Sequence, residues 1–308
     1  MPDKPAAEVP IESALIRGLL AAQATHAIPD HAQLPLRKVA EGWDSEVWRL
    51  GDDYAVRLPR RALAAPLVLH EQAVLPGVAE RLEPLGVRVP APLLNGTPAD
   101  GYPWPWSVVP WLDGASAIEQ SPDERGAWAD ALARALGALH TRAPDDHPVN
   151  PFRGGPLATR TDAVQERLRT LRAAHVLDEM SAAGLHAVWL AGLAATPWDL
   201  APVWIHGDLH PGNLVAREGA LVGIIDFGDV TAGDPAYDLA VAWLAFDAPG
   251  RARFIDAADS RHDAQTWARA RAWAAAVVLM LLAHSDDNPV YFRLGQDAAG
   301  EVLSDTPG

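Results

Sequence analysis

The sequence predicts an α+β fold in two lobes, because strand-like and helix-like segments are segregated along the chain. Short apolar and β-branched runs separated by turn residues fill residues 36–109, whereas helical spacing of apolar residues dominates from residue 115 onward. The helical part also contains two short strand-like runs near residues 203–225. With 308 residues, of which 49% are hydrophobic and 21% charged, the chain is long enough for two globular lobes.

Residues 1–109 are expected to form an N-terminal lobe with a five-stranded antiparallel sheet and a helix. Helical spacing over Ile11–Ala24 precedes three strand-like runs joined by tight turns, which is typical of an antiparallel meander. Asn95–Pro103 is rich in Gly and Pro and is expected to be a turn. The expected strands are Leu36–Glu41, Glu46–Leu50, Tyr54–Leu58, Ala91–Leu94 and Trp106–Val109, and the expected helix is Pro66–Leu82.

Residues 110–114 are expected to be a hinge that leads into a mainly helical C-terminal lobe, residues 115–308. A helix start is predicted at Ser121–Glu124, and the Pro- and Gly-rich stretch Ala143–Thr161 is expected to be irregular. Further helices are expected over Trp128–Leu139, Asp162–His175, Glu179–Leu193, Ala236–Ala245, Arg251–Asp256, Asp263–His284 and Tyr291–Leu303.

The stretch Trp204–Val215, followed by Ile224–Gly228, concentrates polar side chains at a regular spacing. Asp208 is followed five residues later by Asn213 and thirteen residues beyond that by Asp226. Strands are expected over Val203–Ile205 and Leu221–Ile225, and Arg217–Ala220 is expected to be the turn of a hairpin. Such a hairpin brings Asn213 and Asp226 toward one another.

These three residue types suit the transfer of a nucleotide γ-phosphoryl group to a hydroxyl. That reaction mainly needs positioned reactants and neutralised phosphate charge. One carboxylate can accept or orient the hydroxyl proton, while an amide oxygen and a second carboxylate are the hard ligands that Mg²⁺ prefers. Each residue taken alone is also a common turn former or helix cap, so only the combination points to this chemistry.

The motif resembles that of the aminoglycoside phosphotransferase family, which shares the bilobal protein-kinase-like fold and includes macrolide phosphotransferases and choline kinases. The family pattern H-G-D-x-H-x-x-N followed by I-D is matched from His206 to Asp226, and Gly233–Ala240 is similar to its G-D-P-x-x-D-L-A segment. The resemblance implies that Asp208 is the catalytic residue, that Asn213 and Asp226 bind Mg²⁺, and that ATP or GTP is the donor.

Three further residues are expected to support the catalytic loop. His206 is expected to fix the loop rather than to act as a general base, and His210 is assigned a supporting role. For Asp238 two alternatives stay open, because its carboxylate can either brace the loop by hydrogen bonds or cap the helix that begins near Tyr237.

In the kinase-like arrangement, the N-terminal lobe supplies the contacts to the nucleotide. The turn Gly42–Ser45 lies where the family covers the phosphates, although it has a single glycine, and Arg57 takes the place of a strand lysine. We predict an Arg57–Glu71 ion pair. Backbone groups of Val109 and Trp111 are candidates to bind the purine base. The expected nucleotide-binding residues are Arg57, Glu71, Ser45, Val109 and Trp111.

The amino-acid composition limits the kinds of molecule that the chain is expected to bind. A formal net charge of −15 disfavours a nucleic-acid partner and is compatible with a cationic substrate, although solubility alone also explains it. There is no cysteine, and Met1–Pro5 lacks the apolar core of a signal peptide. The apolar run Ala272–Ala283 is shorter than a membrane span and reads as a buried helix. A cytoplasmic enzyme without a membrane or protein partner is therefore expected.

The expected acceptor is a small molecule, because no long activation loop follows Asp226. We expect an aminoglycoside-type antibiotic, which would make the chain a resistance enzyme. A macrolide, a metabolite such as choline or homoserine, and a non-enzymatic pseudokinase-like ligand-binding module are the alternatives. An aminoglycoside pocket needs several carboxylates. The candidates are Asp247, Asp256, Asp259, Asp286, Asp287 and Glu301.

Overall fold

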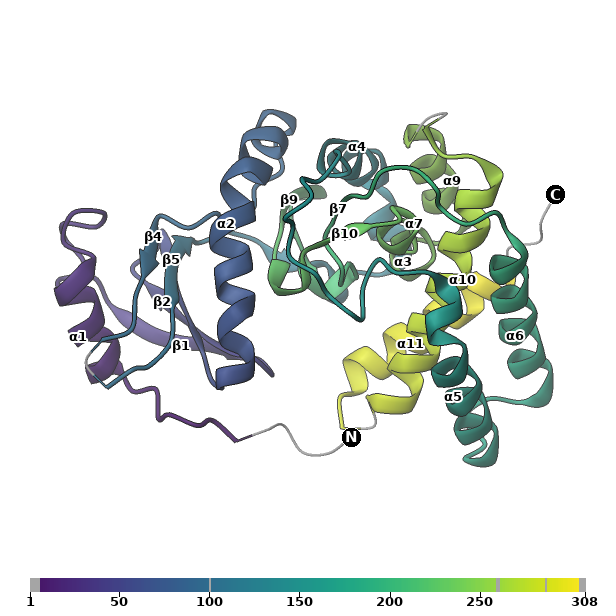
Figure 1. Ribbon diagram of the computed structural model, residues 1–308, viewed down its shortest axis with the longest axis horizontal. Coiled ribbons are helices and arrows are strands. Elements are labelled where there is room, and N and C mark those ends of the chain that lie inside the picture. Colours follow the sequence, from purple (N-terminus) through teal and green to yellow (C-terminus); the bar gives the residue numbers. More distant parts are fainter. Residues whose placement is uncertain (1–5, 100, 259–260, 286, 305–308) are drawn as a thin grey trace. The chain divides into compact units, whose positions relative to one another are not determined.

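The computed structural model describes residues 6–99, 101–258, 261–285 and 287–304, and it divides into two compact units (Figure 1). One unit ends at Asp113 and the other begins at Gly114. This boundary lies within residues 110–114, the stretch that the sequence assigns to the connection.

The N-terminal unit contains the five-stranded antiparallel sheet that the sequence predicts, with the strand order β1-β2-β3-β5-β4. Its strands are β1 (Leu36–Glu41), β2 (Ser45–Leu50), β3 (Tyr54–Pro59), β4 (Leu94–Gly96) and β5 (Trp106–Pro110). Its helices are α1 (Ser13–Gln23) and α2 (Ala65–Leu82), with short 3₁₀ turns at Ala62–Ala64 and Glu83–Leu85.

Strand β4 spans Leu94–Gly96, so the prediction of a strand over Ala91–Leu94 was wrong in its bounds. Proline at positions 90 and 92 lacks the N–H that a strand ladder needs, so regular pairing begins later. Gly96 lies opposite Trp106, where a Cβ atom would overlap the indole ring. A position that appears to be a turn glycine in the sequence is therefore a strand position at which a tryptophan covers the backbone.

The core of the N-terminal unit lies between α1 and the sheet. Ile16, Leu19 and Leu20 of α1 are fully buried in one cluster with Val56 of β3 and Trp106 of β5. The spacing of the three α1 residues places them on one face of the helix, which is the amphipathic pattern expected of a helix that covers a sheet.

The C-terminal unit is mainly helical, as predicted. Its helices are α3 (Pro122–Gly126), α4 (Ala129–Leu139), α5 (Thr161–Ala173), α6 (Glu179–Ala194), α7 (Ala236–Leu239), α8 (Val241–Ala245), α9 (Ala248–Ala257), α10 (Ala264–His284) and α11 (Pro289–Ser304). The first of these starts with a capping box between Ser121 and Glu124. The predicted helix Ala236–Ala245 is divided into α7 and α8.

Helix α10 is the central helix of this unit. It packs against α5, α6, α7 and α11, and Figure 1 shows α5, α6, α10 and α11 side by side. By length and composition, α10 and residues 62–85 are apolar enough to cross a membrane, but 67% of the apolar window of α10 is buried within the unit. Burial of this kind is typical of a core helix, so the composition of α10 is weak evidence for a membrane.

Short strands in the C-terminal unit position the predicted catalytic motif. β7 (Val203–Ile205) pairs with β10 (Thr231–Gly233), and β6 (Ala115–Ser116), β8 (Leu214–Arg217) and β9 (Ala220–Ile224) form a three-stranded sheet. The predicted hairpin is present, because β8 and β9 are antiparallel and Arg217 pairs with Ala220. Short 3₁₀ turns lie at Ala117–Glu119, Leu157–Arg160, Pro211–Asn213 and Phe227–Asp229.

Candidate active site

The loop that carries Asp208 follows β7 and is held by a buried carboxylate. Asp238 accepts hydrogen bonds from the backbone amides of His206 at 2.7 Å and Gly207 at 3.1 Å, and its side chain has no exposed surface. Nε2 of His140 lies 3.1 Å from the same carboxylate. Of the two roles considered for Asp238, the hydrogen bonds that brace the loop are present, whereas α7 has no side-chain cap.

His206 fixes the shape of the same loop. Its Nδ1 accepts a hydrogen bond from the Asp208 amide at 3.2 Å, and its Nε2 lies 2.9 Å from the carbonyl oxygen of Ile225, to which it can donate. The ring is buried and lies 4.4 Å from that of Phe227. Because both ring nitrogens are used within the protein, the geometry suits a structural role rather than general-base catalysis.

Asn213 is tied to both sides of the motif. Its side-chain amide donates to the Asp208 carbonyl oxygen at 2.8 Å, and its own carbonyl accepts from the Ile225 amide at 2.9 Å. The second bond joins the two ends of the β8–β9 hairpin. It therefore holds Ile225, and with it the next residue, Asp226, near Asn213. His210 accepts from the Gly212 amide at 3.0 Å, and its Nε2 lies 3.7 Å from Oδ2 of Asp208.

The residues expected to bind Mg²⁺ have suitable donor atoms. Asn213 uses its NH₂ group toward Asp208, which leaves the side-chain oxygen as the atom for a metal, and the carboxylate of Asp226 is exposed. Asp226 adopts a left-handed conformation with φ 63° and ψ 61°, which is uncommon outside glycine and is frequent at functional sites. Among the described residues, no group of three or more His, Asp or Glu side chains forms a metal site.

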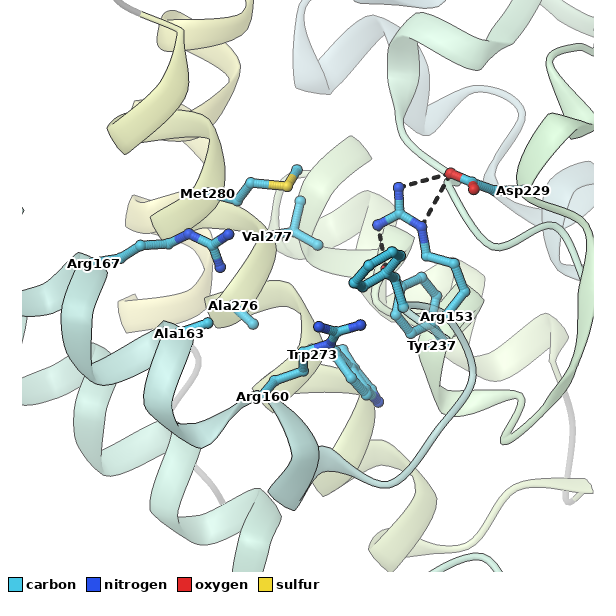
Figure 2. Close-up of a pocket in the computed structure, with 11 residues that line it drawn as sticks. Arg153, Arg160, Ala163, Arg167, Asp229, Tyr237, Trp273, Ala276, Val277 and Met280 are labelled. Carbon is cyan, nitrogen blue, oxygen red and sulfur yellow. Dashed lines mark hydrogen bonds and ion pairs between the residues drawn. The ribbon is translucent and has the colours of Figure 1, made fainter. Parts of the chain in front are cut away.

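Arg153 is a residue of this site that the sequence analysis missed. Its guanidinium lies 3.3 Å from Oδ1 of Asp208, donates to Oδ2 of Asp229 at 2.7 and 3.1 Å, and donates to the hydroxyl of Tyr237 at 2.9 Å. Figure 2 shows the guanidinium held between Asp229 and Tyr237. A single side chain therefore connects the Asp208 carboxylate with a second carboxylate and a tyrosine.

Close approach of two glycines places Arg153. Gly154 has φ +66°, and its carbonyl oxygen accepts from the Asp234 amide at 3.2 Å. A Cβ atom at Gly233 would overlap the Gly154 backbone, so the G-D-P segment needs its glycine to receive this loop. The only sequence signal of this contact was an arginine beside a Gly-Gly pair within the irregular stretch Ala143–Thr161.

The charges around Asp208 favour its ionised form. Burial raises the pKa of the Asp208 carboxyl, but the hydrogen bond and charge of His210 and the positive charge of Arg153 outweigh burial. The pKa of Asp208 is therefore held well below its ordinary value. An ionised carboxylate is suited to accept a hydrogen bond from a hydroxyl and to orient it.

In the N-terminal unit, the predicted ion pair between Arg57 and Glu71 is confirmed. The guanidinium Nη1 of Arg57 on β3 lies 2.9 Å from Oε1 of Glu71 on α2, and only 14% and 6% of these side chains are exposed. Next to Glu71, the amide of Gln72 donates to the carbonyl of Trp106 and the hydroxyl of Ser107 on β5. These contacts fix α2 against the sheet.

Some backbone groups of the residues expected to contact a purine base are bonded within the N-terminal unit. The Trp111 amide donates to the Asp53 carbonyl at 2.7 Å, so it is already used within the sheet. Val109 pairs with Ala55 in the same register, and alternation along an antiparallel strand directs its backbone groups to β3 as well. The predicted contact of backbone groups of Val109 and Trp111 with a purine base stays a prediction. The intervening residue, Pro110, has no N–H.

The turn before Ser45 is tightly bonded. The Gly42 amide donates to the Ser45 carbonyl at 2.8 Å, and the Asp44 carbonyl accepts from the Arg60 amide at 2.7 Å. The Asp44 carboxylate also lies 2.6 Å from Nη2 of Arg61. Ser45 itself is the first residue of β2, where it pairs with Pro59. Its predicted contact with a nucleotide stays a prediction.

A family model described as "Phosphotransferase enzyme family" matches residues 35–273, which includes both the Arg57–Glu71 pair and the complete Asp208 motif. The chain belongs to the phosphotransferase enzyme family. Helices α1 and α11 lie outside the residues that the family model matches.

Individual relatives agree with this assignment. An aminoglycoside 3'-phosphotransferase of Escherichia coli is 31% identical over 137 residues, which are 44% of this chain and 50% of that protein. The match thus spans half the length of this curated relative. The solved GDP and kanamycin complex of APH(2")-IIia shares the fold with a TM-score of 0.65 and 18% identity, covering 92% of this chain and 98% of the other. Macrolide 2'-phosphotransferase MphH from Brachybacterium faecium has a TM-score of 0.58 and 20% identity, covering 94% and 99%.

In this phosphotransferase-family chain, a cavity of about 260 Å³ adjoins the Arg153 cluster. Its wall is formed by α5, α10 and the segment before α5, and Arg153, Asp229 and Tyr237 contribute to it (Figure 2). Asp208 does not itself line the cavity, but Arg153, which does, lies 3.3 Å from the Asp208 carboxylate.

Of the carboxylates proposed for an aminoglycoside pocket, the four that the structure describes are not among the residues that line this cavity. Asp247 caps α9 by accepting from the Gly250 amide at 2.9 Å, and Glu301 lies 2.6 Å from the buried guanidinium of Arg251. Asp256 and Asp287 are exposed to solvent. Two further candidates, Asp259 and Asp286, lie outside the described residues.

Proposed function

We propose that this chain transfers the γ-phosphoryl group of ATP or GTP to a hydroxyl of a small molecule. The observation that carries the proposal is the connected loop in which Asp208 is bonded to Asn213, and Asn213 to the residue before Asp226. This arrangement occurs in a chain whose family is described by phosphoryl transfer. The side chains assigned to the base, metal-binding and phosphate-binding roles have the chemistry that those roles need, which supports the proposal.

In the proposed reaction, the acceptor hydroxyl oxygen forms a bond to the γ-phosphorus, and the bond from that phosphorus to the β–γ bridging oxygen breaks. The nucleoside diphosphate leaves with the electron pair. The hydroxyl proton passes to Asp208 or to solvent. Since the pKa of Asp208 is held low, its main contribution is to orient the hydroxyl, which suits a transition state with little bonding to the nucleophile.

Asn213 and Asp226 are the residues that would hold Mg²⁺, through one amide oxygen and one carboxylate. When bound, the ion neutralises charge on the phosphates and orients them. Within the N-terminal unit, Arg57 offers a guanidinium to the phosphates, and Glu71 keeps that guanidinium in position.

Similar proteins of known structure were solved with GDP, with ADP and with ATP, which supports both purine nucleotides as donors to test. The names of the relatives support aminoglycosides and macrolides as reference acceptors. Both classes offer several hydroxyl groups.

The test is a nucleotide-consumption assay with Mg²⁺, ATP or GTP, and a panel of aminoglycosides, macrolides and small alcohols. We expect turnover that falls about 10³-fold or more in Asp208→Ala, given the usual contribution of a positioned catalytic carboxylate. Asp256→Ala, an exposed aspartate on α9, is the matched control. Nucleotide binding without turnover on any acceptor would instead support the pseudokinase-like binding module.

A further inference from the structure

Three arginines surround the cavity next to the Asp208 loop. Arg153 comes from the irregular segment before α5, Arg160 from the 3₁₀ turn that leads into α5, and Arg167 from α5 itself. Figure 2 shows the guanidinium groups of Arg160 and Arg167 directed toward the space beside Ala276 and Val277, whereas that of Arg153 points to Asp229 and Tyr237. In a chain with a formal net charge of −15, a cavity with three arginines is a local reversal of charge.

The charge of Arg153 is compensated within the protein. It forms ion pairs with Asp229 at 2.7 Å and with Asp208 at 3.3 Å. Arg153 therefore belongs to the catalytic cluster and adds little net positive charge to the cavity.

Arg160 and Arg167 differ from Arg153, because no carboxylate of the described residues lies within ion-pair distance of either. Arg160 donates to the carbonyl of Pro151 at 3.1 Å and lies 5.0 Å from the ring of Phe152. Nε of Arg167 lies 3.5 Å from Nε2 of His284. Burial, followed by the charge of Arg160, lowers the pKa of Arg167. Two half-buried cations that share a cavity are stabilised by an anion between them.

The carboxylate on the cavity wall is already occupied. Oδ2 of Asp229 accepts from Arg153, and Oδ1 accepts from the side-chain amide of Asn150 at 2.7 Å. A polycationic acceptor would therefore meet Arg160 and Arg167 and no uncommitted carboxylate among the described lining residues. This arrangement opposes aminoglycosides, whose ammonium groups need carboxylate partners.

The remaining wall is apolar and aromatic. Tyr237 and Trp273 present rings 4.7 Å apart, and Val277 and Met280 of α10 complete that side. At about 260 Å³, the cavity is slightly smaller than the usual range for ligand pockets, about 300–1,000 Å³. It therefore suits a compact molecule with an apolar or ring-shaped body.

We propose that the acceptor is a small hydroxyl compound with an anionic group, a carboxylate or a phosphate ester, which Arg160 and Arg167 bind in this cavity. The proposal rests on the proposed phosphotransferase function and specifies its substrate class. The anion occupies the Arg160–Arg167 end, the body lies against Tyr237 and Trp273, and the hydroxyl faces the end where Arg153 meets Asp208.

The first experiment compares alcohols that share a skeleton and differ in charge. One set is glucuronate, glucose 6-phosphate, glucose and glucosamine. A second is 4-(hydroxymethyl)benzoate, 1,4-benzenedimethanol and 4-(hydroxymethyl)benzylamine. Binding is measured by the shift in melting temperature at matched ionic strength, and turnover by nucleotide consumption with Mg²⁺. The carboxylate and phosphate members distinguish the two kinds of anion.

The second experiment removes one charge at a time. For an anionic acceptor, Arg167→Gln and Arg160→Gln should each reduce kcat/KM about 10- to 100-fold, mainly through KM, since each loses a charged hydrogen bond. Arg167→Lys should restore part of the loss. Arg169→Gln is the control, because Arg169 lies on the same helix, is 70% exposed and pairs with Glu166.

The outcomes separate this proposal from the proposed function. Preferential binding of the anionic members that is lost in Arg167→Gln supports the anion site. Equal or stronger binding of the neutral or amine members overturns it, even if turnover is observed. If the anionic members bind but neither they nor any aminoglycoside or macrolide is phosphorylated, the anion site is supported and the proposed reaction is refuted.

Discussion

Each unit of this protein holds an arginine against a carboxylate, but the two arrangements are built in different ways. Arg57 and Glu71 lie on a strand and a helix, form one pair and are nearly inaccessible to solvent. Arg153 lies in an irregular segment, contacts Asp208, Asp229 and Tyr237, and keeps 21% of its side chain exposed. The first is an ion pair between two regular elements, and the second is a network around a loop.

The two arginines are held in place by different kinds of contact. The direction of Arg57 follows from the alternation of a strand whose neighbours Val47 and Ser107 fix its register. The segment that carries Arg153 has no such period. It is held by bonds to a distant strand, where the Thr231 hydroxyl donates to the Pro148 carbonyl at 2.7 Å.

The largest effect is expected when Arg153, the arginine of the C-terminal network, is replaced in the variant Arg153→Gln. Because this change removes the charged contacts to Asp208 and Asp229, we expect kcat to fall about 10- to 100-fold. Steady-state kinetics with both substrates varied separates kcat from KM. Arg172→Gln, at an exposed residue paired with Glu179 in the same unit, should leave both constants unchanged. A lower melting temperature with an unchanged kcat would show that Arg153 only supports the fold.

A smaller effect is expected for Glu71→Gln in the N-terminal unit. The substitution keeps the shape of the side chain but removes the charge that holds Arg57, so the nucleotide KM should rise or kcat should fall by about tenfold. Titration of the nucleotide at saturating acceptor measures this change. Glu80→Gln, at an exposed position of the same helix, is the control. Kinetics equal to those of the unchanged protein would contradict a role for this pair in nucleotide binding.

The comparison also explains what the sequence could predict. Asp208, Asn213 and Asp226 lie in local turns and a hairpin, whose residues are close in the chain, so their spacing indicated their convergence. The ion pair of Arg57 and Glu71 was predicted from positions on regular elements. In both cases short-range rules of strands, helices and turns determine the geometry.

The missed features depend on contacts between distant segments. Arg153 contacts Asp208, which lies 55 residues later in the chain. The spacing of residues in the irregular stretch does not predict this contact. Gly96 looked like a turn residue because its partner, the indole of Trp106, is separated from it by a loop. Arg160 and Arg167 are close in the chain, but the opposite wall of the cavity that they line comes from α10, about 110 residues later.

A test of the electrostatic part of the network is the pH dependence of kcat/KM. The pKa of Asp208 is lowered, so its carboxylate stays ionised as the pH falls through the ordinary aspartate range near about 3.9. Activity should therefore show no acid limb from Asp208 down to about pH 4, where an aspartate of ordinary pKa would be about half protonated. In Arg153→Gln, loss of the positive charge should move the acid limb of Asp208 to higher pH. An unchanged profile in this variant would show that Arg153 does not influence the ionisation of Asp208.

The smallest expected effect comes from the glycine that positions Arg153. Gly154 has φ +66°, and a Cβ atom there would lie 2.7 Å from Cδ1 of Ile205. Gly86, in the N-terminal unit, has φ +78° but open space around its Cα. Alanine at either position should lower stability by about 1–2 kcal/mol, because both residues adopt left-handed backbone conformations. Thermal unfolding measures this shared cost.

Measurement of kcat then distinguishes the Gly154→Ala variant from the Gly86→Ala variant. Only Gly154→Ala is expected to reduce kcat, by about 2- to 5-fold, which corresponds to less than about 1 kcal/mol of transition-state stabilisation lost through displacement of Arg153. Equal kcat in the two variants would mean that the loop tolerates the methyl group without moving the guanidinium. The position of Arg153 would then depend on its ion pairs with Asp208 and Asp229 and not on the close approach of Gly154 to Gly233.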